Sequence, residues 1–296
     1  MVLYNETPVV DLNLPVASEK GVRLLIKRED LNHPTVSGNK WWKLKYNLVE
    51  ALRQQKSTLL TFGGAYSNHI YAVAAAANDL KLSSIGIIRG EESKPINPTL
   101  DFAAKMGMHL HFVSRETYRQ KQEQEFVESL HNSFGDFFLI PEGGTNAFAI
   151  KGAAEFADKL KSIQFDHLFV PIGTGGTFAG LIAGFAGDRL LNGVPILKLG
   201  ENLADEVGSL ITSAGYEIHA NWNLLRGYEF GGYAKTTDEL MAFIRTMKYQ
   251  YNLPLDHVYT GKMLFGVVRE ISAGAFPRGT TILAVHTGGL QAARPV

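Results

Sequence analysis

The sequence predicts an α/β protein with two open, mostly parallel sheets, helices on both sheet faces and a cleft between two domains. Short apolar segments alternate with longer helical patterns, and strands separated by helices form parallel sheets. Glycine-rich loops follow four strand-like segments, near Gly63, Gly143, Gly173 and Gly288. Since ligands bind beyond the carboxyl ends of such strands, we expect these loops to line one cleft.

The elements follow from apolar runs and their period. The N-terminal half is predicted to form strands at residues 23–27, 58–62, 84–88, 109–113 and 137–140, and helices at 41–54, 68–80, 98–106 and 115–130. The C-terminal half is predicted to form strands at 168–172, 195–199 and 281–285, and helices at 150–160 and 178–184. In the helix at 41–54, for example, Leu44, Leu48 and Leu52 recur at helical spacing.

Length and composition limit the function. A chain of 296 residues holds two modest domains or one large unit. The predicted division places residues 41–145 in a smaller α/β domain, and residues 1–40 with 146–296 in a larger cofactor domain. Lys+Arg 29 and Asp+Glu 29 balance, so nothing indicates binding to nucleic acid or an anionic membrane. No apolar stretch is long enough for a bilayer and no targeting segment is visible, so a cytoplasmic protein is expected.

No metal site is predicted. The chain has no cysteine, which excludes disulfides and thiolate ligands. His109 and His111 alternate along a predicted strand, a pattern equally typical of exposed polar positions.

The loop at residues 173–177 is a candidate phosphate site. It joins the strand at 168–172 to a small-residue helix, and the free N–H groups and dipole at such a helix start favour a phosphate. The hydroxyls of Thr174 and Thr177 add donors. Neither the P-loop nor the dinucleotide pattern is met. The alternative is a tight turn without a ligand.

Lys40 is the candidate nucleophile or base. It precedes Trp41 and Trp42, which predicts a partly dry, aromatic setting. Desolvation lowers the pKa of a lysine and so activates its amine. A covalently bonding lysine with a separate phosphate loop suggests pyridoxal phosphate. The neighbouring Lys43 and Lys45 are expected to be ordinary solvated lysines.

Six motifs in register extend this hypothesis over nearly the whole chain. They are Ser37-Gly38-Asn39-Lys40, Gly63-Gly64-Ala65-Tyr66-Ser67-Asn68-His69, Pro141-Glu142-Gly143-Gly144, Gly173-Thr174-Gly175-Gly176-Thr177, Val258-Tyr259-Thr260-Gly261-Lys262 and His286-Thr287-Gly288-Gly289. Together they resemble the 1-aminocyclopropane-1-carboxylate (ACC) deaminase and D-cysteine desulfhydrase family. Its members are pyridoxal phosphate enzymes of the tryptophan synthase β-like class, fold type II.

The resemblance implies where the cofactor binds. Lys40 would bind it covalently and remove the Cα proton of the substrate. Asn68 would hydrogen-bond the 3′-oxygen of the ring. The phosphate would be bound by Gly173, Thr174, Gly175, Gly176 and Thr177. A homodimer is also implied.

Three further residues would act on a small amino-acid substrate. Ser67 would face its carboxylate and reacting carbon, and Tyr259 would stack beside the ring or assist proton transfer. Tyr233 matches a second active-site tyrosine. The structural alternatives are that Ser67 caps the alanine-rich helix and that each tyrosine is a core residue with a hydrated hydroxyl.

Two threonines bear on the reaction. Thr260 stands where the deaminase branch of the family has glutamate, and Thr287 stands where it has leucine. His69 also matches the desulfhydrase branch, since the deaminases have glutamine there. A carboxylate keeps the pyridine nitrogen protonated, whereas a hydroxyl leaves the ring a weaker electron sink. A thiol leaving group tolerates that weaker sink, which favours conversion of D-cysteine to pyruvate, sulfide and ammonia.

The sequence also departs from the family pattern. Trp41-Trp42 replaces Thr-Arg, Tyr66 replaces glutamine and Tyr71 replaces arginine, so we expect a reshaped pocket that suits a bulkier D-amino acid. Alternatives are an ACC deaminase forming 2-oxobutanoate and ammonia, a racemase or dehydratase that begins with the same proton abstraction, and a non-catalytic pyridoxal phosphate-binding protein.

Overall fold

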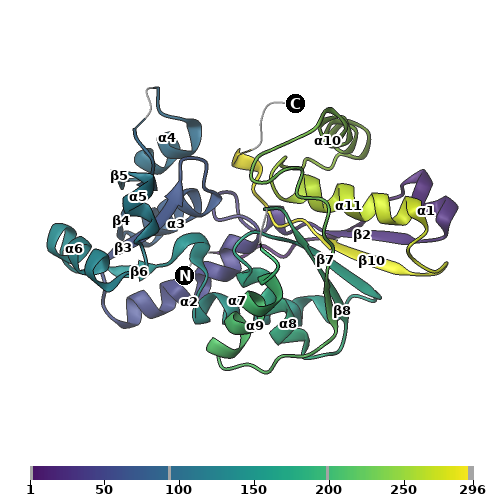
Figure 1. Cartoon of the computed structure of the whole chain (residues 1–296), viewed down its shortest axis with the longest axis horizontal. Coiled ribbons are helices and arrows are strands. Elements are labelled where there is room, and N and C mark those ends of the chain that lie inside the picture. Colours follow the sequence, from purple (N-terminus) through teal and green to yellow (C-terminus); the bar gives the residue numbers. More distant parts are fainter. Residues whose placement is uncertain (1–2, 93–94, 198–199, 293–296) are drawn as a thin grey trace.

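Two sheets lie side by side in the computed structural model, which describes residues 3–92, 95–197 and 200–292 (Figure 1). One sheet has six strands in the order β1-β2-β10-β7-β8-β9, and the other has four in the order β5-β4-β3-β6. Among the strand pairs of the described residues, β1 with β2 is antiparallel and the others are parallel. The predicted fold class is confirmed.

The six-stranded sheet is covered on both faces. Its strands are β1 (Val9–Asp11), β2 (Arg23–Lys27), β7 (His167–Ile172), β8 (Leu190–Pro195), β9 (Trp222–Leu224) and β10 (Thr281–Val285). One face carries α1 (Pro15–Lys20), α10 (Asp238–Tyr251) and α11 (Thr260–Ala273), and the other carries α7 (Ala147–Leu160), α8 (Gly176–Phe185) and α9 (Leu203–Ser213) (Figure 1). Successive residues of β2 point to opposite faces of this sheet. Leu24 and Ile26 pack in the core with α10 and α11, and Leu25 packs in the core with α7, α8 and α9.

The four-stranded sheet is built in the same way. Its strands are β3 (Thr58–Gly64), β4 (Ser83–Arg89), β5 (Met108–Val113) and β6 (Phe138–Ile140). Its helices are α3 (Asn68–Leu80) and α4 (Pro98–Lys105) on one face and α5 (Arg115–Arg119) and α6 (Gln124–Phe134) on the other. Single-turn helices cover Glu29–Leu31, Glu142–Gly144 and Leu290–Ala292. All four strands fall within the predicted smaller domain, whose exact boundaries stay a prediction.

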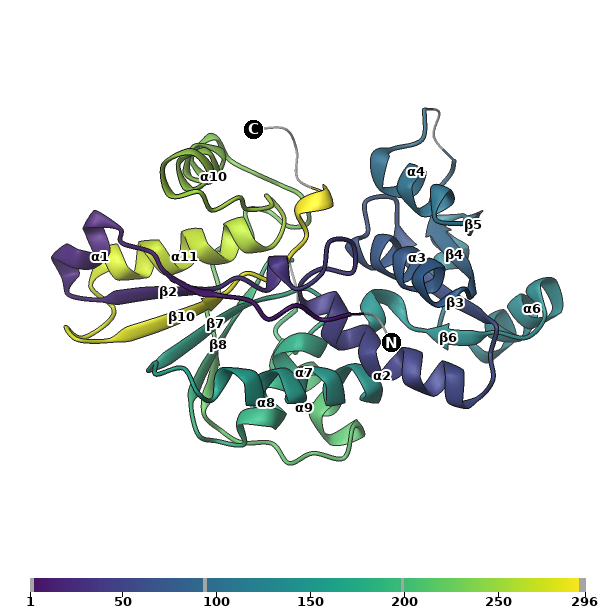
Figure 2. The same cartoon turned by 180° about the vertical axis from the view of Figure 1, so that it is seen from behind.

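Helix α2 (Asn39–Arg53) joins the two halves, as seen from behind in Figure 2. It packs closely on α7, because a Cβ atom at Gly152 would overlap the carbonyl oxygen of Trp42. A Cβ atom at Gly180 of α8 would likewise overlap Ala153 of α7. These small residues let three helix backbones approach one another, which places the first turns of α2 and α8 together.

Two predicted elements are corrected. The strand expected at residues 195–199 instead ends at Pro195, and residues 198–199 lie outside the described residues. The strand covers Leu190–Pro195 and includes Gly193, where a Cβ atom would overlap Ile172 and the ring of Phe178. The helix expected at 115–130 is two helices, α5 and α6. Of the apolar face predicted for α2, Leu52 is 46% exposed.

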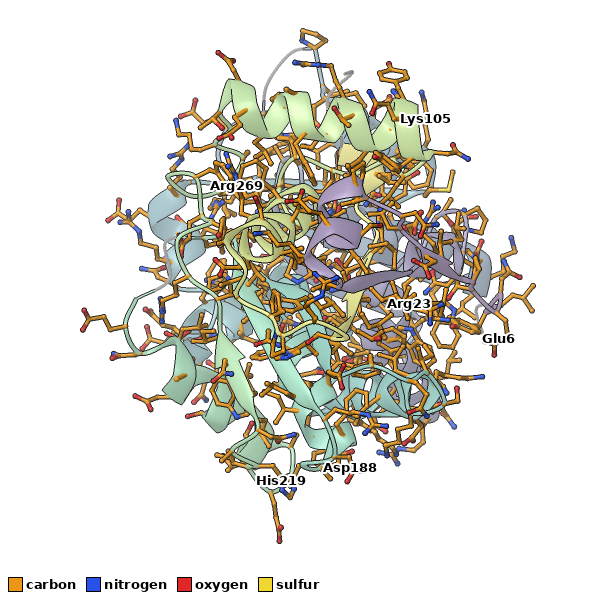
Figure 3. The ribbon with its side chains drawn as sticks, turned by 90° about the vertical axis from the view of Figure 1, so that its right-hand side faces the viewer. Glu6, Arg23, Lys105, Asp188, His219 and Arg269 are labelled. Carbon is orange, nitrogen blue, oxygen red and sulfur yellow. The ribbon has the colours of Figure 1, made fainter. Side chains whose placement is uncertain are left out.

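The periphery carries charged side chains, as Arg23, Lys105 and Arg269 show in Figure 3. They pair with Asp11, Asp101 and Glu239 respectively. No helix in the described parts of the chain has both the length and the apolar character needed to cross a membrane.

Candidate active site

A cavity of about 490 Å³ lies where the carboxyl ends of β3, β6, β7 and β10 meet. Each of the four predicted glycine loops contributes to its wall, through Gly64, Gly143, Gly173 and Gly288. The wall also contains most of the predicted site residues: Lys40, Ser67, Asn68, Thr174, Gly175, Gly176, Thr177, Tyr233, Tyr259 and Thr287. The two halves of the chain therefore build one site.

Lys40 is in the first turn of α2, where its Nζ donates to Asn39 Oδ1 at 3.1 Å. Burial lowers its pKa to about 8, although the carboxylate of Asp256 acts in the opposite direction. The desolvation expected for this amine is present, but Trp41 and Trp42 do not supply it, since neither lines the cavity. Trp41 and Trp42 are buried in the core, because successive residues of a helix point about 100° apart.

Lys43 was expected to be solvated, and this expectation is wrong. Its side chain is 2% exposed, and Nζ donates to Thr145 Oγ1 at 2.7 Å and to Thr174 Oγ1 at 3.2 Å. Burial, together with the charge of Lys40, lowers its pKa well below the usual range. The signal was in the sequence, since residues three apart share a helix face and Lys43 follows Lys40 at that spacing. Lys45 instead pairs with Glu155 at 2.6 Å.

The loop at 173–177 has the backbone geometry that suits an anion. Gly175 precedes α8 with a φ of 80°, a left-handed conformation that suits glycine. This turn presents the free N–H groups of the helix start to the cavity. Two residues of α2 bond this loop: Asn39 Nδ2 donates to Thr177 Oγ1 at 2.8 Å, and Lys43 Nζ donates to Thr174 Oγ1.

Gly38 brings Lys40 against the end of β10. Its φ is 68°, and a Cβ atom there would overlap the carbonyl oxygen of Thr287. Asn39 N donates to that same oxygen at 3.2 Å. The lysine and the predicted cofactor residue Thr287 are thus fixed to each other through the backbone.

The donors of this cavity fit pyridoxal phosphate. An activated amine, that of Lys40, stands in one wall, and a lysine, two threonines and a helix start converge on an anion position in another. Asn68 Oδ1 is buried without a hydrogen-bond partner in the described structure, so a polar group remains to be satisfied there.

Comparison with known proteins agrees. The family described as "Pyridoxal-phosphate dependent enzyme" matches residues 2–288. The chain belongs to this family.

Its relatives define the branch. The enzyme is 31% identical to a Pyrococcus horikoshii protein named "Putative 1-aminocyclopropane-1-carboxylate deaminase", over 97% of this chain and 90% of the relative. It is 30% identical to the Arabidopsis thaliana "Bifunctional D-cysteine desulfhydrase/1-aminocyclopropane-1-carboxylate deaminase, mitochondrial", over 96% and 76%. A solved ACC deaminase homologue superposes with a TM-score of 0.87 at 30% identity, covering 99% and 92%. The enzyme's cofactor is pyridoxal 5′-phosphate, and its branch is that of the ACC deaminases and D-cysteine desulfhydrases.

In this enzyme Ser67 is both a helix cap and part of the cavity wall. Its Oγ accepts from His69 N at 3.2 Å and Ile70 N at 3.3 Å at the start of α3. The hydroxyl proton stays available to a substrate, so the cap and the predicted role are compatible. His69 is buried and its Nε2 lies 2.8 Å from Thr61 Oγ1.

The two predicted tyrosines face the cavity from different segments. The ring of Tyr259 lies against Gly173, where a Cβ atom would come within 3.0 Å of it. Burial, with smaller contributions from Tyr233 and Asp256, raises the pKa of Tyr259 well above its usual range. Tyr233 is 43% exposed, and burial raises its pKa too. Both hydroxyls are therefore protonated donors at neutral pH.

Thr260 is the one predicted cofactor residue that does not line the cavity. It is fully buried at the start of α11, and its hydroxyl donates to Asp256 Oδ1 at 2.6 Å. The same carboxylate accepts from the backbone N–H groups of Val258, Tyr259 and Thr260. No sequence pattern indicated Asp256, because its hydrogen bonds depend on the turn that precedes α11.

Of the aromatic replacements expected to reshape the pocket, Tyr66 alone reaches the wall of this cavity. Trp42 stacks on Phe156 at 5.1 Å, and its Nε1 donates to Glu29 Oε2 at 2.8 Å. Tyr71 stacks on Phe102 at 3.7 Å, facing another depression. The pocket is therefore altered at one position, not four.

Proposed function

We propose that the enzyme catalyses β-elimination from a small D-amino acid, with D-cysteine as the leading substrate. The observation that carries this proposal is that the carboxylates in and just behind the cavity wall already have partners within the protein. In the described residues, Glu142 is the one carboxylate in the cavity wall, and it lies 3.5 Å from Lys121. Asp256, just behind the wall, already accepts four hydrogen bonds. Neither of the two threonine positions that differ between the branches supplies a carboxylate: Thr287 lines the cavity, and Thr260 lies behind the wall with its hydroxyl bonded to Asp256. A cavity without a carboxylate at these positions favours the reaction with the better leaving group.

Bound pyridoxal phosphate supplies an electron sink for negative charge at Cα. Lys40 supplies the base, because a pKa of about 8 leaves part of its amine neutral near pH 7. Its Nζ takes the Cα proton, the electron pair of that bond becomes the Cα–Cβ double bond, and sulfide leaves with the bonding pair of Cβ–S. The released enamine takes up one water to give pyruvate and ammonia. No oxidant or reductant is needed.

The residues of the wall hold the substrate for this step. The Ser67 hydroxyl and the neighbouring Asn68, at the start of α3, provide donors for a carboxylate. Arg89 and Arg115 also line the cavity and make no ion pair within the described chain, so they add positive charge at its rim. Tyr66, 57% exposed, covers part of the opening.

The test is to supply D-cysteine and ACC in parallel to the cofactor-loaded enzyme, with Lys40→Ala as the control. Pyruvate and sulfide in equal amounts from D-cysteine, and no 2-oxobutanoate from ACC, are expected. 2-Oxobutanoate from ACC as the main product would overturn the proposal in favour of a deaminase, the activity that also appears in the name of the Arabidopsis relative. Turnover of neither compound would also overturn it and would direct the search to bulkier D-amino acids.

A further inference from the structure

Lys262 is a buried lysine outside the cavity wall, in the first turn of α11. Its side chain is 0% exposed. Its Nζ donates to the backbone carbonyl oxygens of Gly232 at 2.7 Å and Glu229 at 2.8 Å, and lies 3.5 Å from that of Ile196. An ammonium has three donors, so these three oxygens match its capacity. No carboxylate in the described chain lies within ion-pair distance of it.

The carbonyl oxygens come from segments that each continue into the cavity wall. Ile196 precedes Leu197, Gly232 precedes Tyr233, and Lys262 follows Tyr259 by less than one helical turn; Leu197, Tyr233 and Tyr259 all line the cavity. The ammonium therefore lies at the point where three parts of the wall converge.

The loop that supplies two of the oxygens has an uncommon backbone. Phe230, Gly231, Gly232 and Ala234 have positive φ angles of 52°, 86°, 116° and 54°. Positive φ angles are unfavourable for residues other than glycine, so Phe230 and Ala234 need compensating contacts. Two contacts are present: the ring centroid of Phe230 lies 5.9 Å from Lys262 Nζ and 5.3 Å from that of Phe265.

The amine is charged at neutral pH. Burial lowers the pKa of Lys262 to about 8, while Asp256 and Glu229 raise it from a longer distance. A cation surrounded by carbonyl dipoles orients them toward itself, much as a bound metal ion does in a carbonyl cage.

We propose that Lys262 is a positioning residue whose ammonium serves as an internal cation, folding the 229–232 loop around itself and so holding Tyr233 in the active site. The proposal relies on the proposed function only for the choice of assay. It concerns the substrate side of the site, because the cofactor groups around Lys40 and Lys43 lie on other elements.

The main variant is Lys262→Met, which removes the charge and keeps the chain length. Its matched control is Lys235→Met, an exposed lysine of the same loop whose side chain is not in the cage. Two readouts are needed: kcat and KM with D-cysteine, and the rate of tryptic cleavage at Arg226, a site that is present in both variants and whose cleavage requires no activity. Lys262→Met should lose at least tenfold in kcat/KM and be cleaved at least tenfold faster, with cofactor affinity within threefold of the parent. Lys235→Met should retain the parent's kcat/KM.

A double-variant cycle tests the route through Tyr233. If Lys262 acts by placing this residue, Lys262→Met should cost far less kcat/KM in a Tyr233→Phe background than in the parent. Equal losses in both backgrounds would overturn the proposal, as would an unchanged cleavage rate.

Chemical rescue tests the charge itself. In Lys262→Ala, methylammonium or ammonium chloride should restore protection of the loop from trypsin, whereas tetramethylammonium chloride at equal ionic strength should not. No difference between these salts would overturn the internal-cation role. If Lys262→Met does not fold, Lys262→Gln, which retains an amide donor, takes its place. If the parent enzyme is inactive on D-cysteine, the proposed function is wrong and the kinetic assay cannot be used. The cleavage and rescue measurements need no activity, so they would still decide the role of Lys262.

Discussion

Replacing Lys43 by methionine should have opposite effects on folding and on cofactor binding. The side chain is 2% exposed, and Nζ is held by two threonine hydroxyls, without an ion pair in the described residues. Burial penalises the charged form of this amine and lowers its pKa well below the usual range, so an apolar side chain of similar length removes a cost to folding. The apo form of Lys43→Met should therefore unfold at a higher temperature than the parent.

Cofactor affinity should fall in the same variant. A hydrogen bond to a charged group contributes about 1.5–3 kcal/mol, and each 1.4 kcal/mol is a factor of about ten. Loss of the ammonium beside Thr174 should thus weaken binding of pyridoxal phosphate roughly 10- to 150-fold. Fluorescence titration measures the affinity and calorimetry the unfolding. Lys45→Met, on the same helix and paired with Glu155, is the control. Unchanged affinity, or a lower apo Tm in Lys43→Met alone, would refute the reasoning.

Three further outcomes are expected. Lys40→Ala should keep its circular dichroism but show no measurable pyruvate release; full turnover would remove the lysine from the mechanism. Gly38→Ala should lose about 2–5 kcal/mol of unfolding free energy in urea, from a left-handed backbone and from overlap with Thr287; a loss below 1 kcal/mol would contradict this. Attachment of the cofactor, followed by absorbance, should accelerate with pH with a midpoint about 8, because Lys40 reacts as its neutral amine; a midpoint near that of free lysine would argue against burial of the amine.

The sign of the pH effect on apo stability follows from the same residues. The folded-state pKa values of Lys40 and Lys43 are below the unfolded value, so the unfolded chain binds more protons between the two. Stability of the apo enzyme therefore rises with pH across that interval, from about 8 to about 10.5 for Lys40. Lys43→Met lacks the contribution of Lys43 but keeps those of Lys40 and Lys262, whose pKa values are both lowered to about 8.

The sequence indicated the cofactor site because its signals are local. A glycine pair that ends a strand and a glycine turn that starts a helix each determine the backbone within a few residues, and four such loops must meet at one edge of parallel sheets. Predicting the burial of Lys43 would have needed one more step, which is to work out which face of α2 turns toward the cavity. Counting from Lys40, the face that carries Lys43 turns toward the cavity, and Trp41 and Trp42 turn toward the core.

Other features depend on contacts between distant segments. Glycine generally weakens a strand, yet Gly193 is needed within β8 because Ile172 and Phe178 occupy the space that a Cβ atom would take. Asp256 and Lys262 likewise look like ordinary charged residues. Asp256 is bonded mainly by backbone N–H groups at the start of α11, and Lys262 by backbone carbonyl groups of the 229–232 loop. Because backbone groups are the same in every residue, these partners leave no pattern in the sequence.

Three lysines of this region, the half-buried Lys40 and the buried Lys43 and Lys262, share one energetic feature. In the part of the chain that the structure describes, Lys40, Lys43 and Lys262 make no ion pair and are held by amide, hydroxyl and carbonyl oxygens. Such a site disfavours the charged form of the amine in its low-dielectric setting, so a positive charge there costs folding free energy until an anion binds. Two of these charges face the cofactor cavity, so an anionic cofactor offsets a cost that the apo chain bears alone. The third is enclosed by the loop of Tyr233, where no ligand reaches it. Its cost can be offset only by the carbonyl groups that it gathers, which is why a charge there is suited to holding a loop.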